Sequence, residues 1–283
     1  TPCGTLFPYT TLFRSPFDIP NIRWFIAFRV FFNSRFYYPV FTILFLDFGL
    51  TVAQFSVLNA VWAATIVLAE VPSGAVADII GRKRLLNFAA GVMIVEIGII
   101  SFMPRIDPMV IFAVFLVNRV LSGLAEAAAS GADEALAYDS LKQAGMEDRW
   151  GRVLELLMRY QAAGFVVAMT TGAAVYDPNF MGRVAELLGL DIVLTQDMTM
   201  RFPLYLTFVL ALLAFASTLK MTELADAAYT ETGKSVKHTL AVTLKAGMWI
   251  VKTPFVLWVM LFGMLLDGTI RMVITLSSQY YRM

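Results

Sequence analysis

Long apolar stretches recur along the whole chain, and polar connections separate them. A helix needs about 20 predominantly apolar residues to cross a lipid bilayer. Hydrophobic residues make up 59% of the chain and charged residues only 15%, against about 25% charged residues in a typical soluble domain. The sequence therefore predicts an all-α, polytopic membrane protein. Its seven expected transmembrane helices are 22–47, 53–77, 85–103, 108–131, 153–176, 202–220 and 252–276.

The composition also excludes several other classes of protein. A disordered chain has low hydrophobicity, and a disulfide-stabilised scaffold has many cysteines, whereas Cys3 stands alone here. The 22 Lys and Arg against 21 Asp and Glu leave a net charge of +1, so the chain lacks the basic excess of a nucleic-acid-binding protein. His238 is the single histidine, and we expect neither a metal site nor a cofactor.

The polar segments divide the chain into four parts. Residues 1–15 contain a run, Thr5 to Ser15, that resembles a translated sequencing adapter. This leader lacks the apolar core and cleavage site of a signal peptide, so we expect it to be non-native; the alternative is an ordinary tail. We expect a six-helix bundle over 16–220, a cytoplasmic linker over 221–249, and a seventh helix over 250–283 that begins a truncated second bundle.

Lysine and arginine are concentrated in alternate connections, which sets the expected orientation because cytoplasmic loops carry the excess of these residues. With the amino terminus inside, only Arg105, Arg183, Arg201 and Arg282 fall outside. The inner side then holds Arg14, Arg23, Arg82, Lys83, Arg84, Lys142, Arg149, Arg152, Lys220, Lys234, Lys237, Lys245 and Lys252. We predict a multi-pass protein of the cell membrane with a cytoplasmic amino terminus. The loop 177–201 is predicted to carry a short surface helix near Val184–Leu190.

The connection after the second stretch reads GAVADIIGRKR, from Gly74 to Arg84. We expect Gly74 to let a neighbouring backbone approach closely, and Gly81 to permit a tight reversal. The basic residues, Lys83 among them, anchor the loop in the cytoplasm. Asp78 is an acid at the membrane edge and needs a partner, either a basic side chain or a helix amino terminus.

This connection resembles the signature of the major facilitator superfamily: glycine, three residues, aspartate, two residues, glycine, arginine, lysine. Its place between the second and third helices also fits that family. The run Arg119 to Gly123 resembles the family's arginine motif, with Ser122 where glutamine is common. The resemblance covers about residues 20–283. The glycine–proline pattern that antiporters often carry on the fifth helix is absent between Ala162 and Gly172.

The run Ser130 to Leu141 is similar to the family's inner end of the fourth helix. The resemblance implies that Asp139 partners the motif arginine, Arg82, in an inner-side charge cluster that helps to lock the outward-open state. We therefore expect an inner-loop gating motif made of Gly74, Asp78, Gly81, Arg82, Lys83 and Asp139.

Charged residues inside the predicted spans are the candidates for a functional site, because ionisable groups in a membrane are costly and usually face a cavity or a partner. Arg119 and Glu126 lie seven residues apart, on nearly one face of the fourth helix. Our hypothesis is that they form a core for substrate binding and proton coupling, in which Glu126 takes and releases a proton. The alternative is a fixed ion pair that joins two helices.

The first and seventh helices also carry embedded charge. Arg29 and Arg35 lie in the first, and Asp267 and Arg271, spaced for local pairing, lie in the seventh. The resemblance implies that the first, fourth and seventh helices line a central cavity. Glu70 and Glu96 have no assigned role: Glu70 satisfies backbone freed by Pro72 or pairs with a base of the first helix, and Glu96 faces the bundle or a missing partner.

The resemblance implies a secondary active transporter that moves a small solute, with protons or another ion as coupling partner, by rocking two bundles about a mid-membrane site. Most of the second bundle would be missing from this chain. Three alternative functions remain. A seven-helix receptor is opposed by the predicted orientation, and a membrane enzyme would need a cluster of catalytic residues that the sequence does not indicate. The third alternative is a non-transporting relative that acts as a sensor or scaffold. Arg29, Arg35 and Arg119 favour an anionic or carboxylated solute. The alternative is that these arginines pair with the acids Glu70, Glu96 and Glu126 within the protein.

Overall fold

The computed structural model of the chain describes residues 15–104, 107–224, 245 and 248–280, and these form helices and no strand. The predicted leader thus lies outside the described residues apart from Ser15, and most of the predicted linker lies outside them too. The elements are η2 (Pro16–Asp18), α1 (Pro20–Asn33), η3 (Tyr38–Val40), α2 (Phe41–Asp47), α3 (Val52–Ile80), α4 (Arg82–Phe102), α5 (Pro108–Ala129), α6 (Ala132–Gln143), η4 (Glu147–Arg149), α7 (Trp150–Tyr176), α8 (Pro178–Leu187), α9 (Gln196–Thr199), α10 (Phe202–Lys220) and α12 (Pro254–Tyr280).

Five of the described helices are long and apolar enough to cross a membrane. They match the second to the sixth predicted stretches: Val52–Glu70, Arg82–Phe102, Pro108–Gln143, Glu147–Tyr176 and Gln196–Lys220. In the seventh stretch, Pro254–Gly263 is a shorter apolar helix among the described residues. The first stretch differs from the expected continuous helix, because it is divided into α1, η3 and α2.

The break in the first stretch has identifiable causes. Pro39 has no N–H to donate and restricts the backbone before it, and α1 ends at Asn33. The freed N–H of Phe36 donates to Oγ1 of Thr207 on α10, at 3.1 Å, which meets the requirement that backbone groups inside a bilayer find partners within the protein. Gly172 on α7 gives the broken segment its space, since a Cβ there would lie 1.8 Å from the carbonyl oxygen of Phe36.

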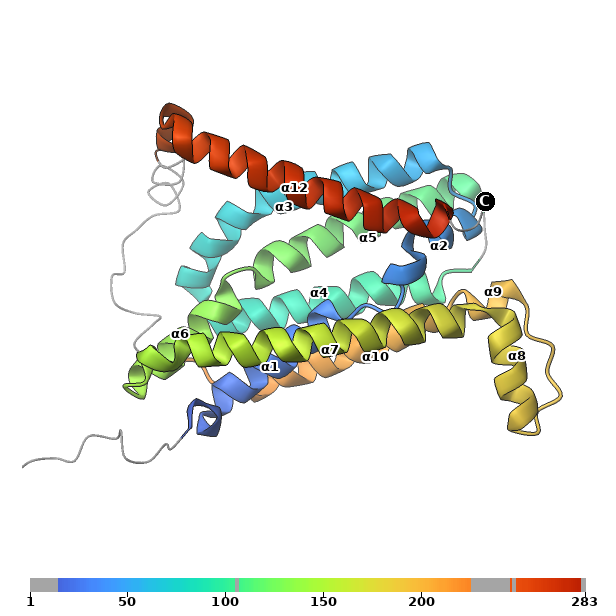
Figure 1. Cartoon of the computed structure of the whole chain (residues 1–283), viewed down its shortest axis with the longest axis horizontal. Helices are drawn as coiled ribbons and strands as arrows, with labels where there is room; N and C mark the ends of the chain where they lie inside the picture. The colour runs from blue at the N-terminus through green and yellow to red at the C-terminus, as the bar shows by residue number, and fades with distance from the viewer. Residues whose placement is uncertain (1–14, 105–106, 225–244, 246–247, 281–283) are drawn as a thin grey trace, which may run out of the picture.

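The helices pack side by side along one direction, and α8 and α12 depart from that arrangement (Figure 1). α4 packs against α5 and α10, α3 against α5, and α1 against α10 and α7. The outward faces stay apolar: Leu68 on α3 is 75% exposed and Val166 on α7 is 59% exposed. Apolar faces of this extent are covered by lipid rather than water in a stable protein.

α8 and α12 lie on opposite sides of this bundle. α8 follows α7 directly and runs across the direction of the long helices, whereas α12 crosses the side formed by α3 and α5 (Figure 1). α12 makes its main contacts with α2 and η3. The predicted surface helix is thus present, but it begins earlier than predicted, because Asp177 caps its first turn by accepting a hydrogen bond from the N–H of Asn179 at 2.9 Å.

Candidate functional site

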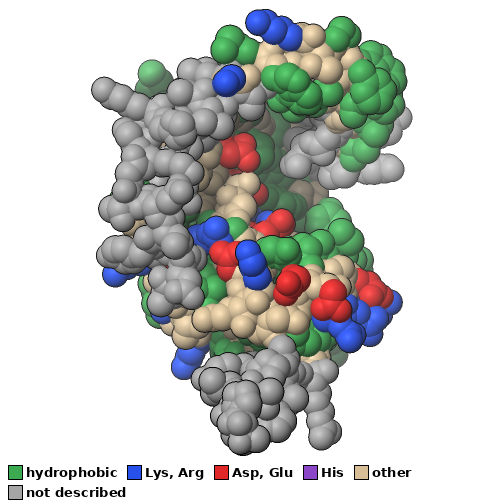
Figure 2. All heavy atoms as spheres, turned by 90° about the vertical axis from the view of Figure 1, so that its left-hand side faces the viewer, with side chains coloured by type: hydrophobic (Ala, Val, Ile, Leu, Met, Phe, Trp, Pro, Cys, Tyr) green, Lys and Arg blue, Asp and Glu red, His purple; other side chains and the backbone are tan. Residues whose placement is uncertain are grey.

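The reversal between α3 and α4 lies at one end of the bundle, which we call the motif end; the end where α7 stops is the far end. Gly81 has a φ of +96°, a conformation that favours glycine. Arg82 then begins α4, and its guanidinium forms an ion pair with the carboxylate of Asp139 on α6. Basic and acidic side chains gather on the face seen from the motif end (Figure 2). The side chain of Asp78 lies outside the described residues.

Glu223 adds a contact that the sequence did not predict. Its carboxylate accepts hydrogen bonds from the backbone N–H of Arg82 at 3.1 Å and of Lys83 at 2.9 Å. The first N–H groups of a helix have no partner inside the helix and favour negative charge, and Gly81 offers no side chain to cap them. Glu223 therefore caps α4 from the segment that follows α10. A signal existed: an acid lies three residues after the end of the sixth predicted stretch.

A buried asparagine joins the same segment to two more helices. Asn21, at the start of α1, donates from Nδ2 to Oγ of Ser140 on α6 at 2.9 Å and to the carbonyl oxygen of Thr222 at 3.0 Å. Its Oδ1 accepts from the N–H of Thr222 at 2.8 Å. The motif end is therefore a network in which α1, α4, α6 and residues 221–224 hold one another.

The expectation for Gly74 is wrong for the residues that the structure describes. A Cβ at Gly74 would meet nothing within 4 Å, so no backbone approaches it closely. The close approach on α3 occurs instead at Thr65, whose Cβ would lie 2.8 Å from a Cβ added at Gly123 of α5. Nine residues separate Thr65 from Gly74, about two and a half turns, so Gly74 lies on the helix face opposite to the one that packs.

Arg29 is engaged by α6. Its Nε lies 2.6 Å from Oδ2 of Asp133, and its Nη2 lies 2.6 Å from Oε1 of Glu134. Asp133 is fully buried and Glu134 half exposed in their side chains. The structure therefore brings Arg29 together with α6, and the described residues show no contact of Arg29 with Arg119 or Glu126.

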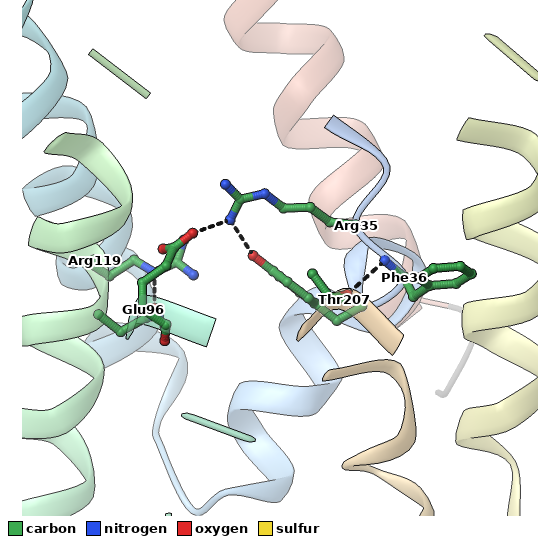
Figure 3. Close-up of polar contacts among 7 residues, drawn as sticks. Arg35, Phe36, Glu96, Arg119 and Thr207 are labelled. Carbon is green, nitrogen blue, oxygen red and sulfur yellow. Dashed lines mark hydrogen bonds and ion pairs between the residues drawn. The ribbon is translucent and has the colours of Figure 1, made fainter. Parts of the chain in front are cut away.

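Arg35 lies in the break of the first span and pairs with Glu96 of α4. Its Nη1 donates to Oε1 of Glu96 at 2.8 Å and to the hydroxyl of Tyr37 at 3.1 Å (Figure 3). Arg35 is 4% exposed and Glu96 is fully buried. Of the two readings left open for Glu96, the structure shows the one in which it faces the bundle. The sequence allowed an arginine to pair with Glu96, but it did not identify Arg35, because the choice of arginine depends on where the helix breaks.

Arg119 lies beside this pair and has fewer partners. Its guanidinium lies over the rings of Phe41 and Phe45, 5.1 Å from each ring centre, and its Nε donates to Oδ1 of Asn118 at 3.3 Å. Asn118 in turn donates to the backbone carbonyl of Glu96 at 2.8 Å. Among the described residues, Nη2 of Arg119 and Oε2 of Glu96 are buried without a hydrogen-bond partner. Such groups are costly in a low-dielectric interior, which marks this place as a functional candidate.

The two remaining acids on this side have different surroundings. Glu126 is partly buried, and its carboxylate makes no hydrogen bond or ion pair with a described residue, although it acts electrostatically on Arg35. The structure shows no ion pair between Arg119 and Glu126. Glu70 accepts a hydrogen bond from Oγ of Ser130 at 3.2 Å, so it joins α3 to the end of α5 rather than to a base of the first helix. The side chains of Asp267 and Arg271 lie outside the described residues.

A comparison with protein families identifies the fold that carries these groups. The family model described as Major Facilitator Superfamily matches residues 23–282. The chain belongs to the major facilitator superfamily. A search of curated proteins found no match.

Membership of the major facilitator superfamily makes the chain a multi-pass membrane protein of a family of transporters for small solutes. Two groups of charged residues stand out within this framework. One is the motif-end network of Arg82, Asp139 and Glu223. The other we call the central cluster: Arg35, Glu96, Asn118, Arg119 and Glu126. No group of three or more potential metal ligands gathers among the residues that the structure describes.

Proposed function

We propose that this chain supplies the first bundle of a secondary active transporter that moves a small solute, with proton coupling, by alternating access. The central cluster carries the proposal. Arg119 and Glu96 each hold a buried polar atom without a partner, beside a break in the first membrane-spanning stretch. Polar groups and broken helices inside a membrane typically mark a substrate or ion pathway.

The proposed roles follow from the partners of each group. Arg35 and Arg119 bind an anionic part of the solute, because arginine presents several donors in a fixed fork. Glu126 takes and releases the proton, because its protonation disrupts no ion pair among the described residues. Asp267 and Arg271 contribute from the second bundle. We assign Arg29 to holding α1 against α6, since Asp133 and Glu134 already contact its guanidinium.

The motif-end network serves as the inner lock in this proposal. The motif end faces the cytoplasm, as the lysine and arginine distribution favours. The contacts of Arg82 with Asp139 and of Glu223 with α4 hold that end in one arrangement, and inward opening would loosen them. Residues 221–249 connect two bundles, and α12 begins the second. The transport cycle requires a second bundle of helices that rocks against the first.

The proposed function is tested by uptake into proteoliposomes. The full open reading frame and the 283-residue chain are reconstituted separately and given labelled solutes grouped by charge: monocarboxylates, dicarboxylates, inorganic phosphate, neutral sugars and cationic dyes. Uptake of an anion by the full-length protein, increased by an imposed proton gradient, is expected, with none by the short chain. Absence of gradient-driven uptake for every group contradicts the transport proposal, and uptake by the short chain contradicts the need for a second bundle.

The coupling role of Glu126 has a separate test. Glu126→Gln in the full-length protein is expected to abolish the effect of the proton gradient while solute exchange at equal pH persists. Glu155→Gln is the matched control, because Glu155 pairs on the exposed surface of α7 with Arg152 and Arg159. Undiminished coupling in Glu126→Gln rules out the proton role.

A further inference from the structure

α8 is an amphipathic helix whose apolar side is only partly covered by the rest of the protein. At 3.6 residues per turn, its apolar residues share one side and its polar residues the other. The apolar side holds Phe180, Met181, Val184, Ala185, Leu187 and Leu188, and the polar side holds Asn179, Arg183 and Glu186. Leu187 is 87% exposed and Phe180 is 44% exposed. Contact of these apolar side chains with water is unfavourable. The position of α8 therefore indicates what covers them.

The chain holds α8 firmly at the far end of the bundle. The cap at Asp177 starts α8 one residue after α7 stops, and Ala185 is buried. The carbonyl oxygen of Tyr176, the last residue of α7, accepts a hydrogen bond from Oγ1 of Thr199 at 2.9 Å, which ties the end of α7 to α9. α8 is therefore an ordered extension of a membrane-spanning helix.

The orientation of α8 matches the boundary between lipid and water. α8 runs across the direction of the long helices at the end of one of them (Figure 1), so it lies roughly in the plane of the membrane in which those helices stand. The apolar surface of α7, which includes Val166 and Val167, faces outward.

Other parts of the same protein are poorly placed to cover α8. The second bundle begins with α12, and α12 lies on the opposite side of the first bundle (Figure 1). The loop after α8 exposes further apolar side chains, among them Ile192 and Val193, which widen the apolar surface instead of covering it. A bilayer surface is a partner that is necessarily present at this position.

We propose that α8 is an in-plane membrane anchor that binds the headgroup–acyl boundary of the leaflet at the far end. Phe180 and Leu187 insert among the acyl chains, and Asn179 and Arg183 face the headgroups and water. Helices with this residue pattern bury their apolar face about 5–10 Å into that boundary. The anchor fixes the depth and tilt of the end of α7, and it does not depend on the solute or the coupling ion.

Site-directed spin labelling tests this assignment. Single cysteines are introduced by Phe180→Cys, Leu187→Cys, Asn179→Cys and Arg183→Cys in a Cys3→Ser background, labelled with a nitroxide, and reconstituted into vesicles of phosphatidylcholine and phosphatidylglycerol. Collisions with oxygen, which concentrates in lipid, are compared with collisions with a water-soluble nickel chelate. Labels at 180 and 187 are expected to favour oxygen several-fold, and labels at 179 and 183 to favour the nickel chelate.

Two outcomes would overturn the proposal. Preference for the nickel chelate at all four positions means that α8 stands in water. Shielding of positions 180 and 187 from both reagents means that protein covers the apolar side, and dipolar broadening between labels would identify that protein as a second copy of the chain. Because these positions are exposed, folding is expected to survive each change, which circular dichroism checks.

Discussion

The motif end and the central cluster both contain charged residues from several helices, but they differ in how many of their polar atoms have hydrogen-bond or ion-pair partners. At the motif end, Arg82 has a carboxylate partner and Glu223 accepts two backbone N–H groups, and these groups are partly exposed. In the central cluster, Arg119 and Glu96 are buried and each retains an unpartnered atom. Exposed, satisfied contacts are individually weak and reversible, whereas buried, incomplete ones are costly unless function requires them. This difference is the basis on which we propose a lock at the motif end and a binding centre in the central cluster.

The central cluster is expected to give the largest single effect on stability. Glu96→Leu leaves the buried Arg35 without its carboxylate partner, and removing one member of a buried ion pair costs about 3–5 kcal/mol. The free energy of unfolding in mixed micelles measures this loss. If the free energy of unfolding falls no further than in the exposed control Glu155→Gln, the buried pair contributes no more to stability than an exposed one, and the two regions do not differ as described.

The break that carries Arg35 gives the second effect. Gly172→Ala places a Cβ against the carbonyl oxygen of Phe36, and overpacking of this kind costs about 1–3 kcal/mol. Gly151 lies on the same helix with open space around it, so Gly151→Ala is expected to stabilise by up to about 1 kcal/mol. Equal melting temperatures for the two variants would show that α7 does not hold the broken segment.

Loss of the cap on α4 is expected to be smaller. Glu223→Ala removes two hydrogen bonds at the amino terminus of α4, and a lost helix cap costs about 0.5–2 kcal/mol. Glu147→Ala, at an exposed acid outside the network, is the control and should stay within about 0.5 kcal/mol of the parent. If both variants unfold at the same denaturant concentration, Glu223 does not act as a cap.

The smallest effect is expected at the ion pair of the motif. Asp139→Asn weakens a partly exposed contact with Arg82, worth about 0.2–1 kcal/mol, and salt should reduce the difference from the parent because it screens exposed charges. Melting curves at low and high ionic strength measure both. A loss of stability that is larger than that of Glu223→Ala and does not change with salt would contradict this expectation. The pair would then behave like the buried contacts of the central cluster.

The sequence predicted the motif end better than the centre, and the reason is physical. Short-range spacing determines the reversal at Gly81 and the register of the spans, so length and hydropathy suffice for most helix positions. The partner of Glu96 depends on where the first span breaks, and Pro39 indicates a break without giving its geometry. The position of Glu223 just after the sixth stretch is visible in the sequence, but its contact depends on how the segment after α10 folds back on α4, and local spacing does not determine that.

Gly74 and Arg29 illustrate two other limits. A glycine in a motif indicates that a close approach is allowed, but the structure places the approach on the opposite face of α3, at Thr65. An arginine inside an apolar stretch indicates a buried partner, but not whether that partner is a solute or, as for Arg29, two acids on α6. Residue type limits the chemistry, and packing decides the partner.

The double substitution Arg35→Leu/Glu96→Leu tests directly whether the buried pair in the broken span serves transport, as we propose, and not only stability. Replacing both members of a buried ion pair by apolar residues is often neutral for stability. The double variant of the full-length protein is therefore expected to unfold near the parent but to lose uptake of the solute identified in proteoliposomes. Restored stability together with parental uptake would contradict the claim, since the pair would then be a structural contact alone.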